Sequence, residues 1–165
     1  MTSPTGHLFI PEFFYSSPVK LLGTVGLHPR GNMSLEQIIG ELRKHPESRR
    51  AGALATFVGM VREDPVRDSE DKVRHLEYEA FEEVAVRRLQ ELRTELLTRD
   101  GIVDLSIHHV IDRLLVGEES LIVAVLGTRR KFVFPVLEEA VKRVKQEVPI
   151  WKKEFTSREA YWVSG

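Results

Sequence analysis

Residues 51–62 read Ala-Gly-Ala-Leu-Ala-Thr-Phe-Val-Gly-Met-Val-Arg, a nearly continuous apolar run that ends in an arginine. Such a run predicts a buried strand, and we expect it to be a central strand of a sheet. Arg62 follows where the strand emerges into a polar loop, a position that can place a guanidinium at the rim of a pocket. A solvated arginine at a strand end has the same pattern, so the pattern alone leaves both interpretations open.

Strands and helices are predicted on both sides of this run. The expected strands cover residues 19–27, 73–81, 103–115 and 121–126, and the expected helices cover 35–44, 82–97 and 134–148. Ser34 is a suitable N-cap for the first helix. Pro149 ends the last helix, and residues 150–154 return as an extended segment. The charges outside the apolar stripes of the two long helices are expected to be solvated, among them Arg88, Glu95 and Arg143.

The length of 165 residues suits one domain, which we place at residues 19–165 behind an N-terminal arm of residues 1–18. Lys and Arg number 24 against 25 Asp and Glu, a net charge of -1, so the chain lacks the basic footprint of a protein that binds RNA or DNA. No signal peptide begins the chain, and residues 121–126 are far shorter than the roughly 20 apolar residues of a membrane-spanning helix. A cytoplasmic protein without membrane contact is expected.

Cysteine is absent from the sequence. This excludes disulfides, thiolate zinc sites and a cysteine nucleophile on this chain, so sulfur chemistry would need a partner. The adjacent His108 and His109 lie on a predicted strand, where neighbouring side chains point to opposite faces and cannot converge on one metal ion. We therefore expect neither a bound metal nor a cofactor.

Cationic side chains gather around the last predicted helix: Arg129, Arg130 and Lys131 precede it, Lys145 lies within it and Lys152 follows it. Together they predict a pocket for an anion, helped by the free N–H groups of the helix N-terminus.

Lys145 lies at the edge of the apolar stripe of that helix, from which its ammonium can reach a cleft. A surface lysine whose stem covers apolar residues has the same pattern. In the extended segment, Lys152 and Lys153 point to opposite sides, so one lysine can face Lys145. Two ammonium groups ~5 Å apart at an effective dielectric of ~20 would repel by roughly 3 kcal/mol and lower one pKa by about two units. A lysine of this kind is prepared for proton transfer or nucleophilic attack.

Three motifs carry a family resemblance: Gly-Ala-Leu-Ala-Thr-Phe-Val-Gly-Met-Val-Arg at 52–62, Leu-Glu-Tyr-Glu-Ala at 76–80 and Pro-Ile-Trp-Lys-Lys-Glu at 149–154. In their order and spacing the chain resembles the MoaE family, the large, catalytic subunits of molybdopterin synthase, from about Val19 to Val163. The resemblance implies an α+β fold of the α/β hammerhead type with an additional antiparallel sheet.

It further implies a homodimer within a heterotetramer, where each large subunit binds a small ubiquitin-like sulfur carrier. That partner brings sulfur as the thiocarboxylate of its C-terminal Gly-Gly tail. The implied substrate is cyclic pyranopterin monophosphate, which receives two sulfurs and becomes the dithiolene of molybdopterin.

By position in these motifs, Lys145 matches the essential lysine of the family and Lys152 the second lysine of the pocket. Arg62 and Arg130 match arginines that we assign to the substrate or to the carrier tail, and Phe57 matches the pocket wall. Arg129 stands where many members have histidine, so it can supply charge and hydrogen-bond donors but no titrating imidazole.

Family members commonly continue with a basic tail that can reach the neighbouring subunit, whereas this sequence ends at Gly165. The competing hypothesis is a protein of the same fold that binds a ubiquitin-like partner or an anionic ligand without catalysis.

Overall fold

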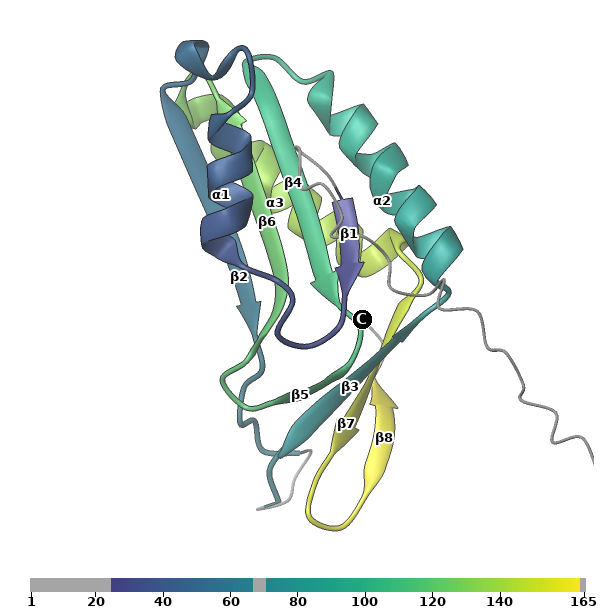
Figure 1. Cartoon of the computed structure of the whole chain (residues 1–165). Coiled ribbons are helices and arrows are strands. Elements are labelled where there is room, and N and C mark those ends of the chain that lie inside the picture. The colour runs from purple at the N-terminus through teal and green to yellow at the C-terminus, as the bar shows by residue number, and fades with distance from the viewer. Residues whose placement is uncertain (1–24, 67–70, 164–165) are drawn as a thin grey trace, which may run out of the picture.

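The computed structural model describes residues 25–66 and 71–163; the predicted arm at 1–18 and the first part of the predicted strand at 19–27 lie outside these ranges. Within them, two four-stranded sheets form the framework (Figure 1). The first sheet has the order β1 (Val25–His28), β4 (Ile102–Val110), β6 (Glu119–Gly127), β2 (Ala53–Met60). The second has the order β5 (Arg113–Leu115), β3 (His75–Ala80), β7 (Ile150–Phe155), β8 (Ala160–Val163). Among the described strands only β1 and β4 pair in parallel, so the second sheet is the antiparallel addition that was expected.

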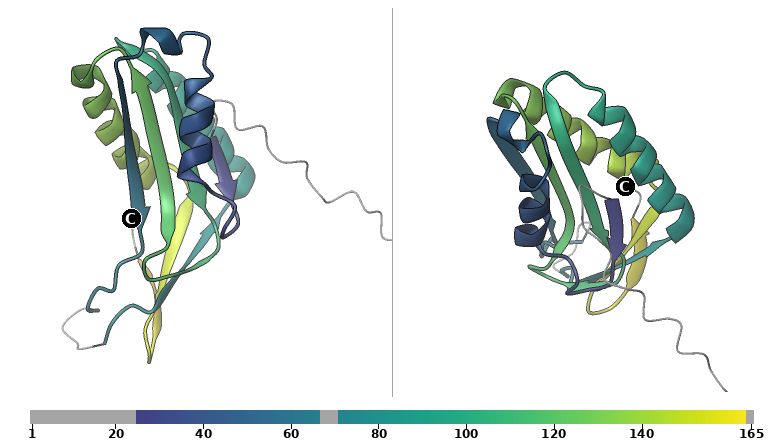
Figure 2. Two further views of the ribbon diagram at one scale, coloured as in Figure 1. Left: turned by 60° about the vertical axis from the view of Figure 1, so that its left-hand side comes forward. Right: turned by 45° about the horizontal axis from the view of Figure 1, so that its top comes forward.

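Three α-helices of the described chain cover the first sheet: α1 (Leu35–Arg43), α2 (Glu82–Leu97) and α3 (Arg130–Glu147). A short 3₁₀ helix, η1 (Ser48–Arg50), lies between α1 and β2. The two views of Figure 2 show α1 on one face of the sheet and α2 and α3 on the other. Each face of the sheet therefore has its own apolar core, and the predicted α+β fold is confirmed. None of the described helices is both long enough and apolar enough to span a membrane.

Local sequence signals account for two of the helices. The Ser34 side chain accepts a hydrogen bond from the Gln37 amide, as an N-cap does, and α1 follows at once. The apolar residues of α2 recur at helical spacing and are fully buried, as predicted: Ala85, Leu89, Leu92 and Leu96.

The position predicted for the strand β2 was wrong, because β2 lies at an edge of the sheet and pairs only with β6 among the described strands. Its apolar character has a different cause. Ala55 and Phe57 pack with the α3 side of the core, whereas Leu54 and Val58 pack with the α1 side. A strand covered by helices on both faces needs apolar residues on both faces, even where no second strand pairs with it.

The strand predicted over 103–115 is two strands in two different sheets, β4 and β5. The chain turns at Asp112, whose carboxylate accepts hydrogen bonds from the amides of Arg30 and Arg113. This turn transfers the chain from the first sheet to the second. Alternation of apolar residues continues through the turn, which is why periodicity alone did not separate the strands.

Helix α3 begins at Arg130, four residues before the predicted start. Pro135 lies inside the helix and cannot donate to the carbonyl of Lys131. Pro135 is the sixth residue of the helix, past its first turn, so one intrahelical hydrogen bond is missing there and the helix nevertheless continues. Arg130 is consequently part of a rigid helical turn rather than of a free loop.

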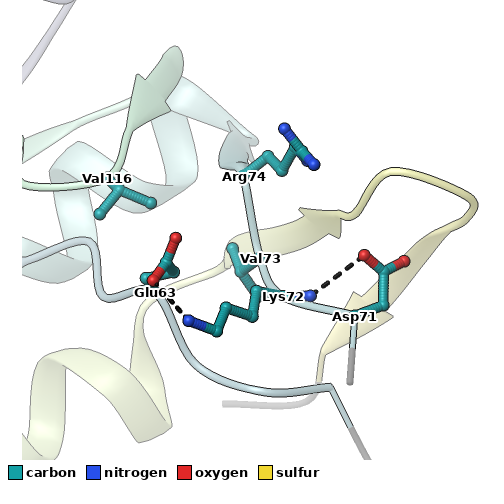
Figure 3. Close-up of a pocket in the computed structure, with 6 residues that line it drawn as sticks. All are labelled: Glu63, Asp71, Lys72, Val73, Arg74 and Val116. Carbon is teal, nitrogen blue, oxygen red and sulfur yellow. Dashed lines mark hydrogen bonds and ion pairs between the residues drawn. The ribbon is translucent and has the colours of Figure 1, made fainter. Parts of the chain in front are cut away.

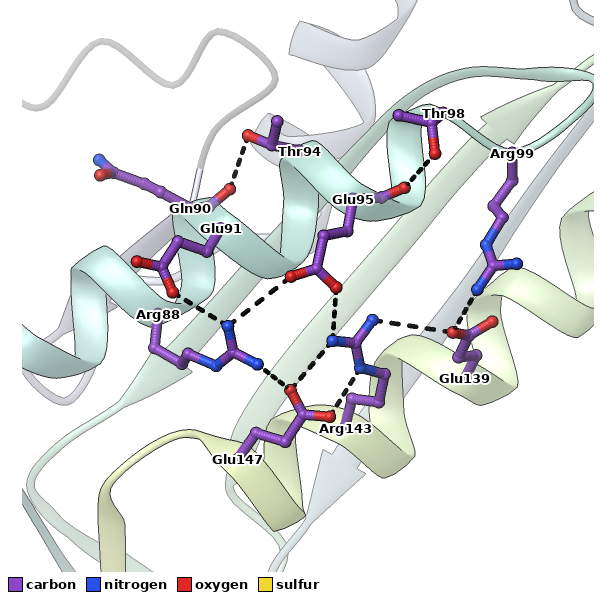
Figure 4. Close-up of polar contacts among 10 residues, drawn as sticks. All are labelled: Arg88, Gln90, Glu91, Thr94, Glu95, Thr98, Arg99, Glu139, Arg143 and Glu147. Atoms are coloured by element: carbon purple, nitrogen blue, oxygen red, sulfur yellow. Dashed lines mark hydrogen bonds and ion pairs between the residues drawn. The ribbon is translucent and has the colours of Figure 1, made fainter.

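Charges predicted to be solvated instead join α2 to α3 (Figure 4). Arg143 of α3 is only 18% exposed and forms ion pairs with Glu95 of α2 at 2.6 Å and with Glu147 at 2.7 Å. Arg88 of α2 also contacts Glu147. Hydrogen bonds from Arg143, and then from Arg88, lower the pKa of Glu147. The two helices pack side by side, so their facing charges pair across the gap.

We expect Arg143→Ala to lower the free energy of unfolding by about 1 kcal/mol at low salt, because one guanidinium contacts carboxylates on two helices. The loss should shrink at 1 M NaCl, where ion pairs are screened. Urea unfolding at both salt concentrations measures it. The control is Lys142→Ala, an exposed lysine on the same helix. Equal losses in the two variants would show that the pairs contribute nothing to stability.

Candidate functional site

A cavity of about 650 Å³ lies where the two sheets meet, between the ends of β2 and β4, the last turn of α3 and the inner face of β3 and β7. Apolar and polar groups both line it. They include Phe57, Met60, Arg62, Tyr78, His109, Ser120, Lys145, Ile150, Lys152 and Glu154. Four of the six residues selected from the sequence therefore converge here: Lys145, Lys152, Arg62 and Phe57.

Lys145 reaches the cavity from the last turn of α3. Val144 beside it is buried, whereas Lys145 is exposed, so the helix turns the lysine away from the core while its backbone stays anchored. Its Nζ lies 5.9 Å from the centre of the Phe57 ring, close enough for a weak cation–π contact. Among the described residues no carboxylate pairs with it. Lys145 is thus a cavity ammonium whose charge remains available to a ligand.

Lys152 enters the cavity from β7, because side chains alternate between the two faces of a strand. Ile150, Lys152 and Glu154 line the cavity. Lys153 lies over the rings of Phe155 and Trp162, at 5.3 Å from each ring centre. The prediction that the two neighbouring lysines point to opposite sides is confirmed. Lys152 differs from Lys145 in having an acidic partner, Glu154, at 3.2 Å.

Arg62 lies two residues beyond the end of β2, at the rim of the cavity. Its side chain is 79% exposed and pairs with Asp64 at 2.8 Å. An exposed pair of this kind is weak, so an anionic ligand can compete with Asp64 for the guanidinium. The sequence left open whether Arg62 is a solvated arginine at a strand end or an arginine at the rim of a pocket. In the structure Arg62 is both, since it is solvated and also borders the cavity.

Two cavity residues were missed as site residues, His109 of β4 and Tyr78 of β3. Their rings meet edge to face with centres 4.9 Å apart. Burial lowers the pKa of His109 to about 4, against an opposing hydrogen bond to the Val110 carbonyl, and the charge of Lys145 lowers it further. Burial raises the pKa of Tyr78, and a hydrogen bond with Ser120 acts in the other direction. Both side chains are neutral at pH 7.

Arg129 and Arg130 do not line this cavity. Arg130 is the first residue of α3 and Lys145 follows fifteen residues later, which at 1.5 Å per residue separates them by roughly 22 Å along the helix axis. Within one chain, these arginines and Lys145 cannot contact the same small ligand.

A shallower depression of about 380 Å³ lies beside the cavity and shares Val73 with it (Figure 3). Lys72 pairs with Glu63 at 2.9 Å there, and its amide hydrogen-bonds to Asp71. Lys72 therefore has an acidic partner, whereas Lys145 has none among the described residues. In residues 25–66 and 71–163, no group of three or more His, Asp or Glu side chains could hold a metal ion.

Comparisons with known proteins point to one family. A family model described as MoaE protein matches residues 31–147. A Bacillus subtilis protein named molybdopterin synthase catalytic subunit is 39% identical over 120 residues, 73% of this chain and 74% of its own length. A Haloferax volcanii protein named probable molybdopterin synthase is 35% identical over 132 residues, 80% of this chain; the match spans half the length of that relative.

Solved structures agree with the sequence comparison. Molybdopterin synthase from Staphylococcus aureus superimposes with a TM-score of 0.72 at 29% identity, over 86% of this chain and 96% of the other. A Helicobacter pylori complex of subunits 1 and 2 of molybdopterin-converting factor contains a chain that superimposes with a TM-score of 0.67, over 84% of this chain and 89% of the other. At 18% identity, this second similarity shows the fold alone.

Proposed function

Because the chain belongs to the MoaE protein family, we propose that it is the catalytic subunit of a molybdopterin synthase. Its substrate is then cyclic pyranopterin monophosphate, and its sulfur donor is the C-terminal thiocarboxylate of a small ubiquitin-like carrier. The observation that carries the proposal is the cavity in which Lys145 has no acidic partner among the described residues, while Lys152 and Arg62 stand at its walls and rim. A cytoplasmic location stays a prediction.

In the proposed reaction the thiocarboxylate sulfur attacks a side-chain carbon of the bound pterin. A C–S bond forms there as the bond from that carbon to a phosphate oxygen breaks, which opens the cyclic phosphate. Water then cleaves the acyl–sulfur bond, which leaves sulfur on the pterin and a carboxylate on the carrier. Lys145 transfers the protons, Lys152 adds positive charge beside it, and Arg62 stabilises the phosphate as its ring opens. A second carrier supplies the second sulfur of the dithiolene at the neighbouring carbon, whose oxygen leaves as water. Sulfur from a partner fits a chain without cysteine.

The direct test mixes the full chain with a thiocarboxylated carrier and the pterin precursor, and follows dithiolene product by mass spectrometry. Product is expected with the thiocarboxylate and none with the same carrier ending in an ordinary carboxylate. A carrier that binds this chain in a pull-down but yields no product would favour the non-catalytic binding protein of the same fold.

Arg129 and Arg130 require a second copy of the chain if they contact the same ligand as Lys145. We therefore propose that the homodimer implied by the family brings the start of α3 from one subunit to the cavity of its neighbour. The roughly 22 Å along α3 supports this arrangement, since the helix cannot bend its first residue back to Lys145.

Mixed dimers test this arrangement. Lys145→Ala chains and Arg130→Ala chains should each be inactive alone and recover activity when refolded or co-expressed together. One of the two cavities in a mixed dimer then has an intact Lys145 from one chain and an intact Arg130 from the other. If Arg130 serves the cavity of its own chain, each cavity in the mixed dimer carries one defect and no activity returns.

A further inference from the structure

His109 lines the cavity and is 7% exposed. It is the second-last residue of β4, at the end of the strand that lies next to the second sheet. Its ring meets the edge of Tyr78, and the positive charge of Lys145 acts on it. Its neighbours Ile107 and Leu105 belong to the same face of the strand and are fully buried. His109 is therefore the point at which the apolar face of β4 becomes the polar wall of the cavity.

Hydrogen bonding determines what this imidazole offers to a ligand. Its Nδ1 lies 2.7 Å from the Val110 carbonyl oxygen, and because a carbonyl can only accept, Nδ1 carries the hydrogen. The neutral ring then has an unprotonated Nε2. In the part of the chain that the structure describes, Nε2 has no hydrogen-bond partner. The surrounding protein atoms do not enclose Nε2 completely, so a ligand can reach it. An acceptor without a partner thus faces the cavity.

Two carboxylates and two hydroxyl groups of the described residues around this ligand space already have partners within the chain. The carboxylate of Asp64 pairs with Arg62, and that of Glu154 pairs with Lys152. The Ser120 hydroxyl donates to the Gly59 carbonyl at 3.2 Å and also hydrogen-bonds with the Tyr78 hydroxyl. The cavity consequently offers cations at its rim and walls and an uncommitted neutral acceptor at its inner end. A ligand that matches this arrangement has an anionic group at one end and N–H donors at the other.

From this arrangement we propose that His109 is a substrate-binding residue, whose Nε2 accepts a hydrogen bond from a ring N–H of the reduced pterin. The inference rests on the proposed function and specifies which end of the substrate lies innermost. The pterin ring enters towards His109 and Tyr78, beside the Phe57 ring, and the phosphate stays near Arg62 and the lysines. A ring without an N–H donor at that position leaves Nε2 unpaired and binds more weakly.

Two variants distinguish the effect of losing the hydrogen-bond acceptor of His109 from the effect of changing the size of its side chain. His109→Leu keeps apolar volume and removes the acceptor, whereas His109→Gln places an amide oxygen close to the position of Nε2. We expect His109→Leu to raise the KM for the pterin by about tenfold, and to raise by the same factor the Kd for the pterin measured by calorimetry without the carrier. A tenfold change corresponds to the loss of one neutral hydrogen bond. The kcat should change much less, and His109→Gln should recover most of the affinity.

His108→Gln is the matched control, because His108 lies one residue away on the opposite face of β4 and contacts His28 instead of the cavity. Its KM should equal that of the wild type. If His109→Leu does not fold, His109→Asn replaces it, since asparagine can still donate to the Val110 carbonyl but is too short to present an acceptor where Nε2 lies.

The outcomes distinguish this inference from the proposed function. Unchanged KM and Kd in His109→Leu would overturn the inference, and so would a loss confined to kcat, which would mean that His109 positions Lys145 instead. Failure of the wild-type chain to bind the pterin would also overturn it. Pterin that binds in a manner sensitive to His109, in a complete mixture that makes no product, would support the inference and refute the proposed sulfur transfer alone.

Discussion

Lys145→Ala is expected to lower the rate of dithiolene formation by about a hundredfold or more, with folding and carrier binding retained. General acid–base catalysis by a positioned side chain contributes roughly 10²–10⁴-fold, and alanine leaves no group that can exchange a proton at this place. Lys145 is exposed and has no ion pair among the described residues, so its removal does not leave a buried partner uncompensated. Single-turnover assays with a thiocarboxylated carrier measure the effect.

Lys142→Ala is the control, since Lys142 lies one turn earlier on α3, is exposed and does not line the cavity. It should keep the wild-type rate. Lys152→Ala should lower the rate of dithiolene formation less than Lys145→Ala does. Lys152 is ion-paired with Glu154, and its proposed role is only to add positive charge beside Lys145. Full activity in Lys145→Ala would refute its role, and an equal or larger loss in Lys152→Ala would reverse the assignment of the two lysines.

Acidification is expected to destabilise the fold strongly, because three histidines are buried in neutral form. His28 and His108 are 9% and 1% exposed and share a hydrogen bond of 2.9 Å. Burial lowers the pKa of both imidazoles, that of His108 to about 3, and the charge of His28 contributes to the shift of His108. Burial similarly lowers the pKa of His109 to about 4. In the unfolded chain each takes up a proton near pH 6.5.

The direction of the effect follows from proton uptake. Where the folded pKa is below the unfolded pKa, the unfolded chain binds more protons, so stability is fully present above pH 6.5 and is lost as the pH falls towards the folded pKa. For His108 each pH unit corresponds to about 1.4 kcal/mol, or roughly 3 kcal/mol by pH 4. This is a large share of the 5–15 kcal/mol or so by which typical domains are stable.

Urea unfolding between pH 7.5 and pH 4 measures this loss. We expect His108→Gln to flatten the slope of unfolding free energy against pH, because glutamine can keep a hydrogen bond to His28 but cannot be protonated. The control is His45→Gln, which removes a histidine from the surface segment after α1. A pH slope in His108→Gln equal to that of the wild type would show that the buried pair does not titrate in this interval.

Much of the site could be predicted because its signals are local. Lys152 and Lys153 are neighbours on a strand, so the alternation of an extended chain determines that they face opposite ways. Pro149 ends α3 and sets where this strand can begin. Arg62 follows directly on an apolar run, which places it at a strand end in any sheet. None of these inferences depends on knowing which other element lies nearby.

His109 could not be assigned in the same way. Alternation shows that it shares a face with Ile107, and this pattern would suit a core histidine equally well. Its place in the cavity depends on the second sheet lying across the end of β4, with Tyr78 of β3 against it. The order of strands within and between sheets is decided by contacts between residues far apart in the chain. The same reason explains why the edge position of β2 was missed.

By itself, then, the sequence determined the helix periods, the Ser34 cap of α1 and the alternation along strands, because these follow from bonds and contacts within a few residues. The tertiary structure alone decided which charges meet. It paired Arg143 with Glu95 of another helix and fixed Arg130 at the far end of the same rigid helix. It also placed Lys145 at the cavity without an ion pair to any residue that the structure describes. Ion pairs and cavities depend on distances between elements, and packing of the two apolar cores sets those distances.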